Sequence, residues 1–197
     1  MKEKKFHRHS DPRIAFFDHH AGNWDADDSA IDANIRRLEE LRGMMGLQSG
    51  QYLLEIGCGT GQITPWFCSA VAPGRVVAVD FSQAMLAKAQ SKGIDADFRL
   101  LDICSERPEG RFDLALCFHS FPHFRDQKGA LANISAVLKP GGELIVMHLA
   151  GSGAINAFHS GVGGAVESDL LPSEQIWPDL LDDAGLKLAE LIDHDDL

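Results

Sequence analysis

Short apolar runs alternate with helical stretches along the chain after Gly50, and this alternation restricts the possible folds more than any other feature. The runs are β-branched or Leu-rich and too short for helices, which is typical of buried strands. We predict strands at 51–56, 75–80, 97–101, 112–118, 143–149 and 186–192, and helices at about 61–71, 82–92, 125–138, 152–160 and 173–184. This repeating order predicts an α/β fold whose doubly wound, mostly parallel sheet carries helices on both faces.

The first 46 residues precede this alternation and follow a different pattern. Residues 1–12 are charged and rich in histidine, without an apolar period. From Ile14 to Gly46, apolar residues recur at spacings of three and four with charged residues between them, which predicts an amphipathic helix. We therefore expect an N-terminal tail and helical lid at 1–46 and a ligand-binding domain at 47–197.

Composition and charge exclude several classes of protein. The 197 residues are 45% hydrophobic and 24% charged, which is the balance of a globular protein with one main core. The formal charge of −11 repels polyanions, so we expect no nucleic-acid partner. No apolar run approaches the ~18 residues of a spanning helix, and the N-terminus lacks a signal sequence, so we predict no membrane span and a cytoplasmic location.

The cysteines give no sign of a disulfide framework or a zinc site. All four are widely spaced, lack a C-x-x-C pair and lie in apolar surroundings: Cys58, Cys68, Cys104 and Cys117. Cysteines in such surroundings are typically reduced and buried. We therefore expect neither disulfides nor a bound metal.

A glycine-rich turn, Glu55-Ile-Gly57-Cys58-Gly59-Thr60-Gly61, directly follows the first predicted strand and leads into a helix. A doubly wound fold binds its ligand at this position. Asp80 ends the second predicted strand, 19 residues beyond Gly61, where a carboxylate can accept hydrogen bonds from both hydroxyls of a ribose. The pair predicts a nucleoside site. The dinucleotide fingerprint would require glycine in place of Gln62, and a Walker Lys-Ser/Thr pair is missing, which disfavours NAD and ATP.

With this turn and this acid, the chain resembles the class I S-adenosylmethionine-dependent methyltransferases, in particular the ubiquinone/menaquinone-biosynthesis-like, type 11 members. The resemblance covers residues 14–192 and implies a Rossmann-like fold, S-adenosyl-L-methionine as the cofactor and methyl transfer as the activity. The turn is similar to the family's first motif, which passes under the methionine part of the cofactor. The cofactor-binding residues implied there are Glu55, Gly57, Cys58, Gly59 and Gly61.

Later segments match the family's pattern in order and spacing. The resemblance implies that Asp80 binds the ribose and that Phe81 and Met85 flank the adenine. It also implies that Asp102 and Ile103 meet the adenine amino group and its neighbouring ring nitrogen, with a plain helix N-cap as the alternative role of Asp102. The family's N-terminal helix often adds an aromatic side chain at the site, here Trp24 or Phe17, with ordinary packing as the alternative.

The fourth and fifth predicted strands complete the resemblance. Phe112–His119 resembles the motif that ends beside the transferred methyl group, which implies that Phe118 contacts the cofactor. Lys139-Pro140-Gly141-Gly142 is similar to the family's turn into the fifth strand, a helix stop followed by a turn. Family members usually end with a seventh, antiparallel strand, whereas this chain stops at Leu197, so that strand is absent or trimmed. The oligomeric state is left open, with a homodimer as one option.

Histidines are the candidate general bases. A phenol, thiol or ammonium acceptor must lose a proton, and histidine titrates near neutral pH. Four candidates follow the fourth and fifth predicted strands: His119, His123, His148 and His159. We place His119 first, because its strand ends nearest the methyl group, and His159 second, because its loop can close over the acceptor. Metal binding by these side chains and Cys117 is disfavoured, because Pro122 breaks the helical geometry between His119 and His123.

The sequence therefore predicts a methyltransferase that uses S-adenosyl-L-methionine to modify a small, uncharged or apolar acceptor, with a quinol as one possible type. Two alternatives belong to other classes of protein. A non-catalytic, cofactor-binding regulatory protein would keep the glycine turn and Asp80 but transfer no methyl group. A metal-handling protein would use the histidines and Cys117 as ligands.

Overall fold

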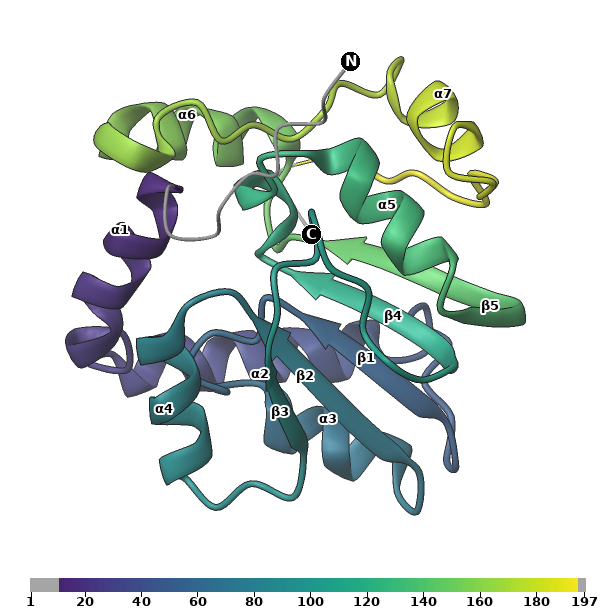
Figure 1. Cartoon of the computed structure of the whole chain (residues 1–197), viewed down its shortest axis with the longest axis horizontal. Coiled ribbons are helices and arrows are strands. Elements are labelled where there is room, and N and C mark those ends of the chain that lie inside the picture. Colours follow the sequence, from purple (N-terminus) through teal and green to yellow (C-terminus); the bar gives the residue numbers. More distant parts are fainter. Residues whose placement is uncertain (1–10, 195–197) are drawn as a thin grey trace.

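The computed structural model describes residues 11–194 of the chain (Figure 1). Five strands form one sheet: β1 (Tyr52–Ile56), β2 (Arg75–Asp80), β3 (Asp97–Leu100), β4 (Phe112–Phe118) and β5 (Leu138–Met147). Their order is β3-β2-β1-β4-β5, and all neighbouring strands are parallel. The predicted doubly wound α/β fold is confirmed. The strand order reverses between β1 and β4, where such folds open a ligand crevice.

Helices cover both faces of the sheet. Residues of α2 (Asp28–Leu41) and α3 (Thr64–Val71) pack on one face, and residues of α5 (Gln127–Ser135) and α7 (Trp177–Asp182) pack on the other. Along β4, Leu114 and Leu116 belong to the α3 side, whereas Ala115 and Cys117 belong to the α5 side. A parallel sheet buried on both faces explains why its strands are almost continuously apolar.

The chain before β1 forms two helices where the periodicity predicted one. α1 (Pro12–His20) leads into a 3-10 turn (Ala21–Asn23), and α2 starts again at Asp28. Asp27 causes the restart, because its carboxylate accepts hydrogen bonds from the backbone amides of Ser29 and Ala30 and so caps α2. Residues 1–10 of the predicted tail lie outside the described part of the chain.

The prediction of a strand at 186–192 is wrong. Residues 11–194 contain no strand after β5, and the apolar side chains of Leu188, Leu191 and Ile192 are 38–40% exposed. The segment instead returns to the start of α6 (Ser152–Val162), where Asp193 accepts hydrogen bonds from Ser152 N and Ser152 Oγ. Apolar alternation favours a strand, but a strand forms only where a neighbouring backbone supplies its hydrogen bonds.

The boundaries of β5 also differ from the prediction. The strand begins at Leu138, and the predicted turn at Lys139–Gly142 is a bulge within it, between the pairs Phe112–Leu138 and Leu114–Glu143. The preceding helix, α5, ends at Ser135. α4 (Gln83–Ser91) flanks β2 and β3 and packs against α1. No helix in the described part of the chain is long and apolar enough to cross a membrane.

Candidate functional site

A cavity of about 290 Å³ lies at the carboxyl ends of β1, β2 and β4. Its walls come from the turns that follow these strands and from the N-terminal segment. The predicted site residues on its walls are Glu55, Gly57, Cys58, Gly59, Asp80, Phe81, Met85, Asp102, Ile103, Phe118 and His119. The cavity therefore brings together all the predicted site residues except Gly61 and His159.

The glycine turn fits against the end of β4 so closely that only glycine can occupy position 57. Gly57 has φ +75°, and a Cβ built on it would lie 2.4 Å from Ser120 Cβ. Ser120 Oγ donates a hydrogen bond to Ile56 O at 2.6 Å, which joins the ends of β1 and β4. Gly61 has a packing role, because its Cβ position faces Ala89 at 3.1 Å. The turn therefore holds backbone amides at the cavity wall without side chains in between.

Asp80 is the acid beside this turn. Its carboxylate accepts hydrogen bonds from Gly59 N and Ser82 N, each at 2.8 Å, and its side chain is buried. Burial raises the pKa of Asp80 to about 6, although these backbone hydrogen bonds act to lower it. A carboxylate has about four acceptor positions, so Asp80, with backbone hydrogen bonds from Gly59, Phe81 and Ser82, can still accept one from a hydroxyl group of a ligand in the cavity.

Glu55 is the second buried acid of the cavity. Thr64 Oγ1 donates a hydrogen bond to Glu55 Oε2 at 2.7 Å. Burial raises the pKa of Glu55 to about 8, and the nearby charge of Asp80 adds to the increase while the bond from Thr64 opposes it. A positively charged ligand beside these two carboxyl groups would favour their ionised forms.

Asp102 has its own partners on the cavity wall. It is buried, accepts hydrogen bonds from Cys104 N and Ser105 Oγ, and forms an ion pair with Arg125. Its carboxylate thus closes the turn after β3, but no helix begins there, so Asp102 is not the helix N-cap considered as its alternative role. Ile103 lies beside it in the cavity lining, so an adenine contact at this turn stays a prediction.

Two of the four histidines form a pair at the ends of β4 and β5. His119 has φ +53°, an uncommon backbone conformation outside glycine, and its ring lies 5.1 Å from that of His148, centroid to centroid. Burial lowers the pKa of His119 to about 4 and that of His148 to about 3. Both ring nitrogens of His148 are buried without a hydrogen-bond partner among the described residues. Both side chains are therefore neutral at pH 7.

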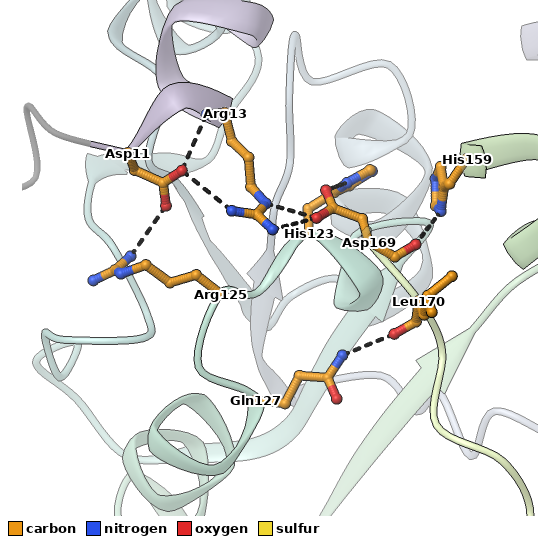
Figure 2. A network of polar contacts seen from close by, with 8 residues as sticks. All are labelled: Asp11, Arg13, His123, Arg125, Gln127, His159, Asp169 and Leu170. Carbon is orange, nitrogen blue, oxygen red and sulfur yellow. Dashed lines mark hydrogen bonds and ion pairs between the residues drawn. The ribbon is translucent and has the colours of Figure 1, made fainter. Parts of the chain in front are cut away.

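The other two histidines meet Asp169, in the chain between α6 and α7 (Figure 2). His123 Nδ1 lies 2.7 Å from Asp169 Oδ2, and His159 Nδ1 lies 2.7 Å from the carbonyl oxygen of Asp169. His123 lines the cavity, and the ring centroid of His159 lies 4.8 Å from that of His123. The predicted base His159 thus lies outside the cavity lining.

The N-terminal segment closes one side of the cavity. Phe17 and Trp24 both line it, with ring centroids 5.7 Å apart. α1 is held there by Asp18, which accepts hydrogen bonds from Ser82 Oγ at 2.5 Å and Ala84 N at 3.1 Å. Trp24 and Phe17, considered in the sequence as site aromatics, therefore lie at the predicted cofactor cavity.

Sequence reasoning missed the charged residues that surround this segment. Asp11 and Arg125 line the cavity, and Arg13 binds Asp169 across 156 positions of sequence. The only available signal was Asp11 before Pro12, a combination typical of a helix start. No local pattern marks Asp169 or Arg13. Within residues 11–194, no group of three His, Cys, Asp or Glu side chains is arranged to hold a metal ion.

Comparisons with known proteins agree with this geometry. Residues 54–146 match a methyltransferase domain family, type 11. Ubiquinone biosynthesis O-methyltransferase of a Bradyrhizobium species is 35% identical over 60% of this chain and 47% of its own length. The 27-O-demethylrifamycin SV methyltransferase of Amycolatopsis mediterranei is 30% identical over 64% and 48%. The solved complex of DhpI with S-adenosylhomocysteine shares the fold, with a TM-score of 0.58, 24% identity and coverage of 68% of this chain and 65% of that one.

Fold, cavity and sequence matches together define a class I S-adenosylmethionine-dependent methyltransferase. Within that class, residues 54–146 match the type 11 methyltransferase domain family, and the chain is similar to methyltransferases of ubiquinone and menaquinone biosynthesis. It spans about half the length of the two curated relatives described above. The cavity fits S-adenosylmethionine, because its glycine turn presents bare backbone and the carboxylate of Asp80 can accept a hydrogen bond from a ribose hydroxyl.

Proposed function

We propose that this protein transfers the methyl group of S-adenosyl-L-methionine to a small-molecule acceptor. The observation that carries the proposal is the buried carboxylate of Asp80, held by two backbone amides beside the glycine turn at the cavity wall. When bound, S-adenosylmethionine supplies an electrophilic methyl group on a positively charged sulfur. The task of the chain is then alignment, because correct placement of the nucleophile provides most of the rate acceleration in such displacements.

The lining residues suggest separate roles along the cavity. We assign Asp80 to the ribose, Phe81 and Met85 to the two faces of the adenine, and the turn at Glu55 and Gly57 to the methionine end. This assignment is supported by the order of these residues along the carboxyl edge of the sheet. Each of these roles can be tested by substitution of one side chain.

The acceptor side of the cavity lies at the end of β4, where we assign Phe118 to the wall and His119 to the acceptor. Burial lowers the pKa of His119 to about 4, so its neutral ring suits a hydrogen bond that orients the acceptor. A neutral ring of such low pKa is a weak proton acceptor at pH 7. A catalytic role for His159 stays a prediction, which its position outside the cavity lining makes indirect.

Two observations support a small-molecule acceptor. The cavity has a volume of about 290 Å³, which is near the size of a small-molecule pocket. The two curated relatives are named for ubiquinone biosynthesis and for 27-O-demethylrifamycin SV. The cytoplasmic location and the homodimer remain predictions from the sequence.

Calorimetry with S-adenosylhomocysteine tests the cofactor site. We expect a dissociation constant in the micromolar range and a loss of at least about tenfold in Asp80→Ala, since a hydrogen bond to a charged group contributes roughly 1.5–3 kcal/mol. Asp113→Ala is the control, because Asp113 lies on β4 at the opposite end of the sheet and pairs with Lys139. Unchanged affinity in Asp80→Ala, or tighter binding of NADH than of S-adenosylhomocysteine, would contradict the proposal.

Transfer itself is tested separately with S-adenosylmethionine carrying a labelled methyl group. We expect a metabolite of cell extract to gain the mass of that methyl group when the wild-type protein is present and not when Asp80→Ala replaces it. Binding of S-adenosylhomocysteine without any labelled product would instead indicate a cofactor-binding protein that catalyses no transfer.

A further inference from the structure

Three side chains from distant parts of the chain meet beside the cavity (Figure 2). Arg13 of α1 donates to Asp169 Oδ1 through Nε at 2.7 Å and also through Nη2. Asp169 Oδ2 lies 2.7 Å from Nδ1 of His123, in the 3-10 turn Phe121–His123 that follows β4. Each oxygen of the carboxylate thus has its own partner.

The carboxylate of Asp169 is charged although its side chain is fully buried. Burial opposes ionisation, but the hydrogen bonds from His123 and Arg13 outweigh it and lower the pKa of Asp169 below its usual value. An ion pair with Arg13 alone would already compensate this charge. The additional contact with His123 is therefore not needed for charge compensation, and its effect is on the imidazole.

The carboxylate fixes the tautomer and the orientation of His123. An ionised carboxylate only accepts hydrogen bonds, so Nδ1 of a neutral His123 carries the hydrogen and Nε2 keeps its lone pair. The ring is packed edge-on between Phe17 and His159, with centroid distances of 5.0 and 4.8 Å. His123 lines the cavity and is 16% exposed, so its Nε2 is the ring nitrogen left for a ligand.

The other histidines lack this combination. Burial lowers the pKa values of His119 and His148 to about 4 and about 3, which makes both poor proton acceptors near pH 7. His159 bonds a backbone carbonyl oxygen and lies outside the cavity lining. Of these four histidines, only His123 both contacts a carboxylate and lines the cavity.

We propose that His123 is the general base for a phenol-type hydroxyl of the acceptor, with Asp169 as its positioning residue and Arg13 as the residue that holds Asp169. The proposal rests on the proposed methyl transfer. His123 Nε2 takes the hydroxyl proton, and the freed electron pair of the oxygen forms the bond to the methyl carbon. The electron pair of the broken carbon–sulfur bond stays on sulfur, which becomes a neutral thioether, and His123 later releases the proton to water.

Aromatic walls favour a flat acceptor of this kind. Phe17, Phe118 and Phe124 line the cavity together with His123, and aromatic rings pack well against one another in offset or edge-on arrangements. A phenolic hydroxyl has a pKa near 10, so it needs a base at pH 7 but can be deprotonated by solvent at higher pH. The need for His123 should therefore decrease as the pH rises.

The tautomer is tested without any acceptor, by ¹⁵N NMR of histidine-labelled protein at pH 8, with His123 assigned through its missing signals in His123→Gln. We expect a protonated Nδ1 and an unprotonated Nε2 in the wild type, and loss of this preference in Asp169→Asn. A protonated Nε2 in the wild type would overturn the proposal. Calorimetry should give S-adenosylhomocysteine affinities within about twofold of wild type for both variants, whereas failure of the wild type to bind would refute the proposed function instead.

The chemical step is tested with labelled S-adenosylmethionine and with 3,4-dihydroxybenzoate and catechol as probes. We expect His123→Gln to lower kcat by roughly 10²–10⁴ with little change in KM, and the loss to shrink as the pH rises toward 9. His19→Gln, an exposed histidine of α1, is the matched control and should retain activity. If His119→Gln rather than His123→Gln shows the loss with rescue at high pH, the base is misassigned. If a wild type that binds S-adenosylhomocysteine methylates none of these phenols, the acceptor class is wrong.

Discussion

At the residue scale, the buried ring of His148 carries an energetic cost. Both of its nitrogens lack a partner in the described structure, and an unpaired buried polar group costs about 1–3 kcal/mol. We expect His148→Phe, which keeps the ring shape, to increase the free energy of unfolding by about 1 kcal/mol in urea titrations at pH 7. His159→Phe should decrease it, because His159 bonds the carbonyl oxygen of Asp169.

A second substitution guards against simple overpacking by the larger phenylalanine ring. His148→Leu should also be neutral or stabilising if the nitrogens truly have no partner. Loss of more than about 1 kcal/mol in both variants would mean that His148 has a hydrogen-bond partner in solution. The same outcome would make His148 a polar contact of the site.

The residues that the sequence located best are those whose role depends on local backbone geometry. Gly57 was predictable because a turn between strand and helix needs a positive φ, and Asp80 because it ends the adjacent strand. The contact of Arg13 with Asp169 was not predictable, because it joins residues 156 positions apart and neither lies in a periodic segment. His123 was recognised as one of four candidate histidines, and only its contact with Asp169 distinguishes it from the others.

At the scale of elements, the same reasoning explains which strands were found. β1, β2 and β4 are buried on both faces, so each appears in the sequence as a short apolar run. The segment 186–192 has a similar pattern but pairs with no strand, and Asp193 hydrogen-bonds to the start of α6 instead. Composition reports how much apolar surface a segment carries, whereas pairing depends on which backbone lies next to it.

The N-terminal helix α1 is the element that we expect to respond to the cofactor. It lines the cavity with Phe17 and is tied to the rest of the fold by Asp18 and Arg13. Bound S-adenosylhomocysteine should slow amide exchange over residues 14–24, because a ligand beneath the lid adds contacts that opening must break. Hydrogen–deuterium exchange with and without ligand measures this.

The helix α2 provides the internal control for that experiment. Leu38 is fully buried against the sheet, so exchange in the second half of α2 should be slow in both states. Protection of residues 14–24 that does not change with ligand would show that α1 is ordinary packing and not a lid. Equal slowing of α1 and α2 would indicate general stabilisation by binding and not closure.

At the scale of the whole molecule, the buried groups of the site set how stability depends on pH. The pKa values of Glu55 and Asp80 are raised by burial, so the folded protein keeps protons that the unfolded chain loses as the pH rises. The pKa values of His119 and His148 are lowered by burial, so as the pH falls the unfolded chain binds protons at these histidines before the folded protein does. The acids therefore weaken the fold toward high pH, and the histidines weaken it toward low pH.

These opposing effects overlap between about pH 4.5 and 6, where two acids and two histidines should nearly cancel and give a plateau of stability. Below the plateau the effect of Asp80 ends near pH 3.8, whereas that of His148 continues to about pH 3. The loss there is deepened by Asp25, Asp113 and Asp169, whose pKa values are lowered in the folded state and whose stabilisation disappears as they are protonated. Of the two acids and two histidines, only Glu55 still titrates above about pH 6.5, up to its pKa of about 8.

The alkaline side of this profile can be assigned to Glu55 by one isosteric substitution. Glu55→Gln keeps an oxygen that can accept the hydrogen bond from Thr64 but cannot ionise. In the ligand-free protein we expect it to remove a decline of up to about 1.4 kcal/mol per pH unit between pH 6.5 and 8, measured by urea unfolding. Glu174→Gln makes the same chemical change at an exposed position and should leave the slope unaltered.

The −11 net charge of the chain also disfavours the compact state, but it acts on both variants alike. An equal decline in wild type and Glu55→Gln would therefore mean that Glu55 is already ionised at pH 7 and that its surroundings are more hydrated than its burial implies.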